Sequence, residues 1–289
     1  MFRIMALILV LAGAVPSWAA GERLPVWQVQ GERAEIVILG SMHMTFPGIY
    51  PLRDEILAAF AASDTLVVEV DIGGENSLEM QQMVMRKGML PPGETLHQYL
   101  SPKTMEQLEK YLSDRGLAPS VYTSLHPGLL MMTLSSMRME ALGMQVELGI
   151  DQHFLDLARG EKVILELESA EQQLDLLLGF PDQDMLLAQT LSQLDDIEET
   201  ITVLYIAWKN GDAEELNRLL LEDEQQRNPQ FQPVYDKMFG ERNLQMTGKI
   251  TGLLETGGRY FVVVGAGHLV GEKGIIALLQ KAGYQARRL

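Results

Sequence analysis

The chain has 289 residues, of which 39 are acidic, 23 are basic and none is cysteine, so its formal net charge is −16. This length accommodates one large domain or two modest ones, and an apolar content of 47% excludes wholesale disorder. Without cysteine there is no disulfide, no cysteine-ligated zinc or iron–sulfur site and no thiol nucleophile. The acidic excess argues against nonspecific nucleic-acid binding, which needs a basic surface.

The first 19 residues have the pattern of a cleaved secretory signal. Arg3 supplies a positive charge, residues 4–15 are almost wholly apolar, and Pro16 precedes small residues that favour cleavage after Ala19. The apolar run is shorter than the roughly 20 residues that span a bilayer. We therefore expect a periplasmic or secreted protein with no stable membrane span after cleavage; a retained anchor is the alternative.

Residues 20–289 begin with two β-rich runs, 26–30 and 35–39, whose connection predicts a hairpin. Helical spacing at 51–63 and an apolar strand at 65–70 then complete a strand–helix–strand unit, which predicts a parallel pair of strands. The next elements expected in chain order are helices at 77–89, 102–115 and 129–142, a short strand at 145–149, a helix from Asp151 to Gly160 and a strand at 162–167.

The second half of the chain is mostly helical before it returns to a strand. Residues 171–254 are acidic and show little strand signal, whereas 259–264 form the clearest buried strand of the sequence. A helix at 271–283 and an edge strand at 284–289 follow. We expect one α/β domain over 20–289, in which helices flank a central, largely parallel or mixed sheet and a helical insertion occupies about 171–257.

Two segments share a layout in which a histidine follows a buried strand. Gly40-Ser41-Met42-His43 comes after one β-rich run, and Gly265-Ala266-Gly267-His268 comes after another. Each histidine lies just past the carboxyl end of its strand, which is the edge where open α/β sheets build ligand sites. The G-x-x-H spacing alone is a weak signal, and a capped or solvated histidine is the alternative. The other histidines, His97, His126 and His153, have no matching context.

Glu69 lies in an otherwise apolar strand, where burial of a carboxylate is costly without a partner. Strand alternation predicts that it shares a face with Asp71. The alternative is an exposed strand end that pairs with a lysine or arginine. If the strands that end at His43 and Glu69 are neighbours, Glu69 can meet both histidines. Two imidazoles and a carboxylate suit a divalent transition metal with positions open for water.

Six strings run in order from about residue 26 to the C-terminus: ILGSMH, LVVEVD, GIDQHFLDLA, LELESAEQQLDLL, ERNLQM and VVVGAGHLVGEKGIIALLQKAGY. Together they resemble the TraB/GumN family, which includes the Tiki proteases. The hallmark of that family is a pair of G-x-x-H motifs with an acidic residue, and His43, His268 and Glu69 stand at those positions. The resemblance implies a metal-dependent hydrolase with a divalent ion, Mn, Co or Zn, and Tiki members cleave peptides near a substrate N-terminus. A distantly similar protein binds haem.

Three further positions follow the family pattern. Arg242 resembles an arginine near the family's site, where its charge can hold a substrate carboxylate or an oxyanion; a surface ion pair with Glu241 is the alternative. Asp151 either orients a ligating histidine or caps a helix. Glu168 lies in Leu-Glu-Ser, where the family usually has Leu-Glu-Thr, and is either a second general base or a charge at a strand end.

These observations predict an exported metal-dependent hydrolase, a peptidase with a peptide or protein substrate. His43, Glu69 and His268 are the expected metal ligands, and Glu69, Glu168 and Arg242 are the expected catalytic residues. Glu69 or Glu168 takes the proton of the attacking water, and Arg242 steadies the tetrahedral intermediate. The alternative is a non-catalytic periplasmic protein that binds metal or haem or assists polysaccharide export. The sequence leaves the substrate, the metal and the oligomeric state open.

Overall fold

A computed structural model describes residues 23–71 and 77–289, and one six-stranded sheet organises them. The order across the sheet is β4–β3–β5–β2–β1–β6. The strands are β1 Val26–Gln30, β2 Ala34–Ser41, β3 Thr65–Val68, β4 Val163–Glu166, β5 Gly258–Gly265 and β6 Gln285–Arg288. The predicted signal sequence at 1–19 lies outside the described residues.

The sheet is mixed, as the sequence predicts. Strands β4, β3, β5 and β2 are parallel, whereas β1 is antiparallel to both β2 and β6. The predicted β1–β2 hairpin and the predicted edge strand β6 are both confirmed. The predicted pairing of β2 with β3 is wrong, because β5 lies between them and pairs with each. A central strand is covered on both faces, and the continuous apolar run of β5 meets that requirement.

The described part of the chain contains thirteen α-helices besides the sheet. They are α1 Asp54–Ala62, α2 Ser77–Gly88, α3 Pro102–Asp114, α4 Pro127–Ala141, α5 Ile150–Ala158, α6 Ala170–Leu178, α7 Gln183–Leu194, α8 Ile197–Lys209, α9 Ala213–Asn217, α10 Asp223–Arg227, α11 Gln232–Tyr235, α12 Arg242–Thr256 and α13 Ile275–Lys281. None of the helices in residues 23–71 and 77–289 has the length and apolar character of a membrane span.

The strand predicted at 145–149 is wrong. Val146–Leu148 form a 3₁₀ turn, and a single bridge between Gln145 and Thr45 is the β pairing found there. The chain turns because the next helix, α5, must begin beside the end of β2, where the N–H of Ile150 donates to the carbonyl of Met42. Local apolar character predicts extended structure, but this tertiary contact decides the conformation.

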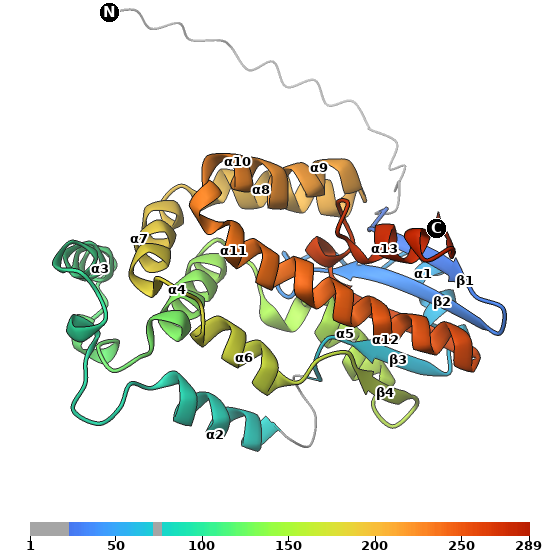
Figure 1. Ribbon diagram of the computed structural model, residues 1–289, viewed down its shortest axis with the longest axis horizontal. Helices are drawn as coiled ribbons and strands as arrows, with labels where there is room; N and C mark the ends of the chain where they lie inside the picture. Colours follow the sequence, from blue (N-terminus) through green and yellow to red (C-terminus); the bar gives the residue numbers. More distant parts are fainter. Residues whose placement is uncertain (1–22, 72–76) are drawn as a thin grey trace, which may run out of the picture.

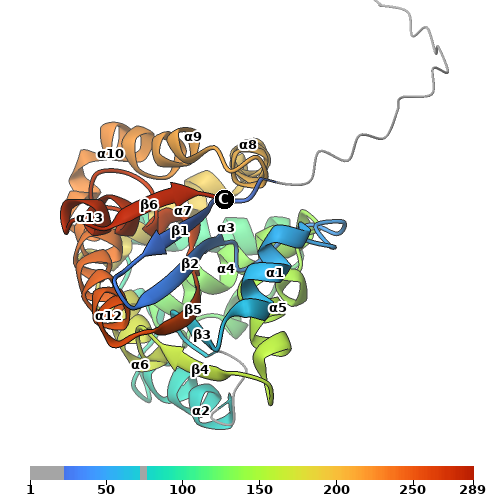
Figure 2. The same ribbon diagram turned by 90° about the vertical axis from the view of Figure 1, so that its right-hand side faces the viewer.

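Alternating side chains of the sheet face two different layers of helices. Phe261 and Val263 of β5 belong to the core that also contains residues of α1 and α5, whereas Val262 and Val264 belong to the core formed with α12 and α13. Figure 2 shows α1 and α5 on one side of the sheet and α12 and α13 on the other. The sheet is thus the middle layer of three.

A separate helical group lies to one side of the sheet, where Figure 1 shows α2, α3, α4, α6 and α7 together. Buried apolar residues of α3, α4 and α7 form a core of their own. Helices α2 and α6 are the next helices after β3 and β4, so this group is connected to the carboxyl edge of the sheet. The segment predicted as an insertion, 171–257, includes α7 of this group and α12, which returns to the sheet through Met246, Ile250 and Leu254.

Candidate functional site

One predicted site residue follows each of the four parallel strands, and all four residues lie at the same edge of the sheet. In spatial order, Glu168 follows β4, Glu69 follows β3, His268 follows β5 and His43 follows β2. The condition that the strands of His43 and Glu69 be neighbours is not met. Because β5 lies between them, however, it places His268 in the middle of the set.

Three of these side chains converge on Gly265, the last residue of β5. A Cβ atom added there would lie 3.2 Å from Glu69 Oε1, 3.6 Å from His268 Cδ2 and 3.9 Å from His43 Nε2. The absence of a side chain at Gly265 therefore keeps open the space that the three residues share.

Glu69 is buried and both of its carboxylate oxygens are hydrogen-bonded. Oε1 accepts the backbone N–H of Gly265 at 2.6 Å. Oε2 accepts from Arg242 Nη2 at 2.8 Å and from Gln173 Nε2 at 3.1 Å. Of the two interpretations drawn from the sequence, the exposed strand end is wrong, because Glu69 and its partner arginine are both largely buried.

Asp71 is not part of this cluster, although strand alternation predicts that it shares a face with Glu69. Strand β3 ends at Val68, so the alternation does not extend to residue 71. The carboxylate of Asp71 instead forms a two-pronged ion pair with Arg159, with 2.7 Å and 3.2 Å between the bonded atoms.

His268 is buried and held through Nδ1, which lies 2.6 Å from the side-chain oxygen of Asn243. Its other ring nitrogen, Nε2, lies 3.7 Å from Glu69 Oε1. The ring of Phe239 packs on the imidazole ring of His268, with 5.4 Å between the two ring centroids. Burial lowers the pKa of His268 to about 4, although the negative charge of Glu69 acts to raise it. The imidazole is therefore neutral at pH 7.

His43 is also held through Nδ1, which lies 2.9 Å from Asp151 Oδ2, while the hydroxyl of Ser41 donates to Asp151 Oδ1 at 2.8 Å. The Asp151 carboxylate raises the pKa of His43 to about 9, although 66% of the His43 side chain is exposed. The N-cap interpretation of Asp151 is wrong, since Gly149 caps α5. Asp151 lies in the first turn of that helix and orients His43.

Arg242, at the start of α12, bonds two carboxylates at once. Its Nε and Nη2 donate to Glu168 at 2.8 Å and 2.6 Å, Nη2 also donates to Glu69, and Nη1 donates to the carbonyl of Met238 at 3.2 Å. Only 13% of its side chain is exposed, so the surface pair with Glu241 is not the arrangement found.

Glu168 is buried against this guanidinium. Burial raises the pKa of its carboxyl, but hydrogen bonds from Arg242 and Gln173 outweigh that effect and hold the pKa below the ordinary value. Gln173 Nε2 donates to Glu168 at 3.0 Å as well as to Glu69. The amide thus joins the two carboxylates, and its bond to Glu168 helps to hold that carboxyl in the ionised form.

Sequence reasoning missed three partners of these residues, namely Ser41, Gln173 and Asn243. Each lies inside a string that carries the family resemblance, and Asn243 directly follows Arg242. No periodicity marks them, because each makes a contact with a residue 25 to 110 positions away. The histidines without matching context lie elsewhere: His126 accepts the N–H of Gly128 at the start of α4, and His153 packs on the ring of Tyr50.

Two imidazoles and a carboxylate are donor types that suit a divalent ion. Both histidines use Nδ1 for a hydrogen bond, which leaves each Nε2 as the ligating atom, and Glu69 Oε1 faces one of them. Within residues 23–71 and 77–289, however, no three His, Asp or Glu side chains already stand in ligand geometry. An ion held by these three residues would therefore require their side chains to move from their positions in the structure.

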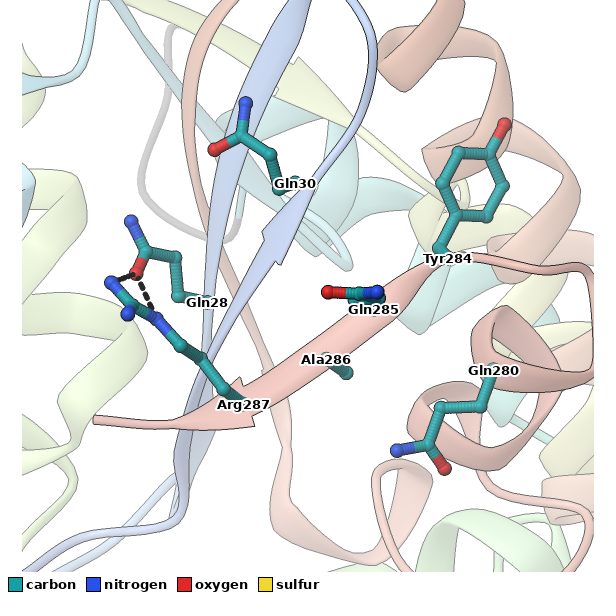
Figure 3. A pocket seen from close by; sticks show the side chains of 7 residues that line it. All are labelled: Gln28, Gln30, Gln280, Tyr284, Gln285, Ala286 and Arg287. Carbon is teal, nitrogen blue, oxygen red and sulfur yellow. Dashed lines mark hydrogen bonds between the residues drawn. The ribbon is translucent and has the colours of Figure 1, made fainter.

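A surface hollow of about 660 Å³ lies apart from this cluster (Figure 3). Its walls are Gln28, Gln30, Gln280, Tyr284, Gln285, Ala286 and Arg287, from β1, α13 and the chain around β6. Figure 3 shows the guanidinium of Arg287 bonded to the side-chain oxygen of Gln28. None of the predicted site residues lines this hollow.

Residues 25–288, which include every residue of the cluster at the sheet edge, match the profile of the TraB/PrgY/gumN family. The chain belongs to the TraB/PrgY/gumN family. The resemblance seen in the sequence is thus confirmed for this TraB/PrgY/gumN protein. No solved structure matches it.

The relatives of this TraB/PrgY/gumN protein carry no named activity. The uncharacterized protein YbaP of Escherichia coli K12 is 29% identical over 245 residues, which cover 84% of this chain and 87% of the relative. YbaP of Shigella flexneri gives the same values. An uncharacterized protein of Treponema pallidum is 23% identical over 218 residues, 73% of this chain and 64% of the relative.

Proposed function

We propose that this protein is a divalent-metal-dependent hydrolase, a peptidase that acts on peptide or protein substrates. His43, Glu69 and His268 are the proposed ligands, for Mn, Co or Zn. The observation that carries the proposal is the convergence of the three side chains on Gly265, with Nδ1 of each histidine already bonded. The resemblance to the TraB/GumN family, which covers residues 25–288 and includes the Tiki proteases, supports the class of reaction.

The charges of the cluster favour a bound cation. Glu69, Glu168 and Asp151 are three buried carboxylates, and Arg242 offsets one negative charge. Buried charges need partners of opposite sign. A protonated His43 offsets a second charge, and this proton must leave before Nε2 can bind an ion. A divalent cation thus replaces the proton and neutralises the remaining carboxylate.

The chemistry divides between the ion and the protein. A bound divalent ion lowers the pKa of a water molecule and polarises the scissile carbonyl. Glu168 is the proposed general base because Glu69 serves as a ligand, and its lowered pKa keeps it ionised to receive a proton. The hydrogen bonds from Arg242 reduce the basicity of Glu168.

Arg242 is proposed to act on both the carboxylates and the substrate. Its Nε and Nη2 groups hold Glu168 and Glu69. Each Nη carries two N–H donors, so Nη1 retains one N–H beyond its bond to Met238. That donor is the proposed contact for the oxyanion of the tetrahedral intermediate.

Export to the periplasm or out of the cell is part of the proposal. The charged, apolar and small-residue pattern of residues 1–19 supports it. N-terminal sequencing of the protein recovered from a Gram-negative periplasmic fraction should find a chain that begins at Ala20. A full-length chain that stays with the membrane would show a retained anchor instead.

The proposed activity is tested by reconstitution of the protein with Mn²⁺, Co²⁺ or Zn²⁺, followed by metal analysis and digestion of a peptide library. We expect stoichiometric metal and cleavage that a chelator abolishes. Glu69→Gln should lose the bound metal and the cleavage. Glu109 is an exposed carboxylate on α3, so Glu109→Gln should retain the metal and the cleavage. A protein that stays metal-free and inert with every ion would refute the proposal. A haem Soret band that is lost in His43→Ala or His268→Ala would favour the binding protein instead.

A further inference from the structure

Asn243 is the most deeply buried polar residue in contact with the proposed ligands, with 1% of its surface exposed. Both ends of its side-chain amide are engaged. Nδ2 donates to the backbone carbonyl of Lys273 at 2.9 Å, and Oδ1 lies 2.6 Å from His268 Nδ1. The amide therefore connects the backbone of the 266–274 loop to the imidazole of His268.

The direction of these two bonds determines where the His268 proton sits. A backbone carbonyl can only accept, so the NH₂ end of the Asn243 amide must face Lys273. The oxygen end must then face His268, and an amide oxygen can only accept. We propose that Asn243 is a positioning residue that fixes the tautomer of His268 with the proton on Nδ1 and the lone pair on Nε2.

The alternative tautomer has an obvious competitor in the structure. A proton on His268 Nε2 could be donated to Glu69 Oε1, which lies 3.7 Å away and needs only a small movement. Such a bond would leave His268 Nε2 without a free lone pair and would engage Glu69 Oε1, and these are the two atoms that an ion requires. Asn243 prevents this closed arrangement. The effect of Asn243 on metal binding rests on the proposed function, whereas its effect on the tautomer of His268 does not.

An amide also orients the ring without adding charge. The cluster already contains the carboxylates of Glu69 and Glu168 near His268. An aspartate at position 243 could accept the Nδ1–H in the same way, but it would place another negative charge beside them and lose the donor to Lys273. At His43, where the side chain is exposed to solvent, the orienting group is a carboxylate, that of Asp151.

The test is ¹⁵N-edited NMR of the histidine rings in the metal-free, full-length chain, with His268 assigned through a His268→Phe variant. Wild type should show a protonated Nδ1 on His268. Asn243→Leu, which keeps the side-chain shape but removes both bonds, should shift the proton to Nε2. Asn243→Asp, which keeps the acceptor, should retain the proton on Nδ1. The matched control is Thr247→Val one turn later on α12, where a buried hydroxyl has no hydrogen-bond partner among the residues that the structure describes.

The outcomes separate this inference from the proposed function. An Nε2 proton in wild type, or an unchanged tautomer in Asn243→Leu, overturns the role of Asn243 whether or not the protein binds metal. Titration with Co²⁺ should show affinity about 10- to 100-fold weaker in Asn243→Leu than in Thr247→Val, the range typical for loss of a ligand's orienting partner. If wild type binds no Co²⁺, the proposed function fails while the NMR result on the tautomer still stands.

Discussion

Arg242 and Glu69 lie 173 positions apart in the chain and form a buried ion pair, with 2.8 Å between Nη2 and Oε2. The same guanidinium bonds Glu168, 74 positions away. A residue at the start of α12 thus joins the ends of β3 and β4. Because carboxylates close together repel, this arginine is what allows Glu69 and Glu168 to be buried side by side.

Loss of this guanidinium should destabilise the fold. Arg242→Met keeps much of the side-chain volume but leaves two buried carboxylates without their cation, and we expect a loss of about 3–5 kcal/mol in the free energy of unfolding. Urea denaturation measures it. Arg227→Met is the control, since Arg227 is 67% exposed in its ion pairs and should change stability by less than about 1 kcal/mol. Equal losses in both variants would contradict a special role for Arg242.

The contribution of Glu168 should depend on pH in the acid range. Its pKa in the folded protein lies below the ordinary value of 4.5, so its ionised form stabilises the fold above that value. This stabilisation is lost as the pH falls through the folded pKa. Wild type should therefore exceed Glu168→Gln in stability at pH 6 to 7, and the difference should shrink below pH 4.5. A difference that is constant from pH 7 to 3 would contradict the ionised, arginine-bound state.

His43 should titrate well above an ordinary histidine in the metal-free protein. NMR of wild type should give a pKa near 9, and Asp151→Asn should return it toward 6.5, because the neutral amide removes the main attraction. The protonated pair favours the folded state below pH 6.5, and this preference disappears as the pH rises through 9. The prediction fails if Asp151→Asn leaves the titration of His43 where it was.

A methyl group at Gly265 should disturb the site rather than the backbone. The φ and ψ of Gly265, −52° and 135°, are accessible to any residue, so Gly265→Ala causes no conformational strain. Its Cβ would occupy the space shared by Glu69, His43 and His268. We expect metal binding to weaken at least tenfold, while circular dichroism shows a folded protein.

The matched control for this substitution is Gly248→Ala. Gly248 lies in α12, where an added methyl group would meet open space, so alanine there should stabilise the helix by about 0.5–1 kcal/mol. It should leave Co²⁺ titration unchanged. Normal Co²⁺ affinity in Gly265→Ala would show that the three side chains do not share an ion at this glycine.

Thr247→Val should stabilise the protein. Within residues 23–71 and 77–289, the buried Oγ1 atom of Thr247 has no hydrogen-bond partner, and a buried unsatisfied hydroxyl costs about 1–3 kcal/mol. Valine has the same branched shape and removes this cost, so thermal denaturation should show a gain of about 1 kcal/mol. A loss of stability would mean that the hydroxyl has a partner, such as a water molecule.

Several features of the site are readable in the sequence because they depend on local patterns. Apolar runs that end in glycine predict where strands stop, and His43 and His268 follow these points directly. A charged residue inside an apolar run singles out Glu69 in the same way. The edge of the sheet where they meet follows from the rule that carboxyl ends of parallel strands lie together.

Other features depend on which strands become neighbours, and no local pattern encodes that choice. The sequence predicts β2 beside β3, whereas β5, 190 or more positions later, lies between them. Gln173 and Asn243 look like ordinary polar helix residues until the fold places them against Glu69 and His268. Asp151 likewise could be a cap or an orienting group until its distance to His43 is known.

The sequence by itself therefore determined the family, through the strings that resemble it, and it determined the α/β class and the residue types of the candidate site through periodicity and motif spacing. Only the tertiary structure decided how the charges are paired and which ring nitrogen of each histidine is left free. The physical reason is that burial and hydrogen-bond geometry arise from contacts between distant segments. Arg242 meets Glu69 and Glu168 only after α12 packs on the sheet.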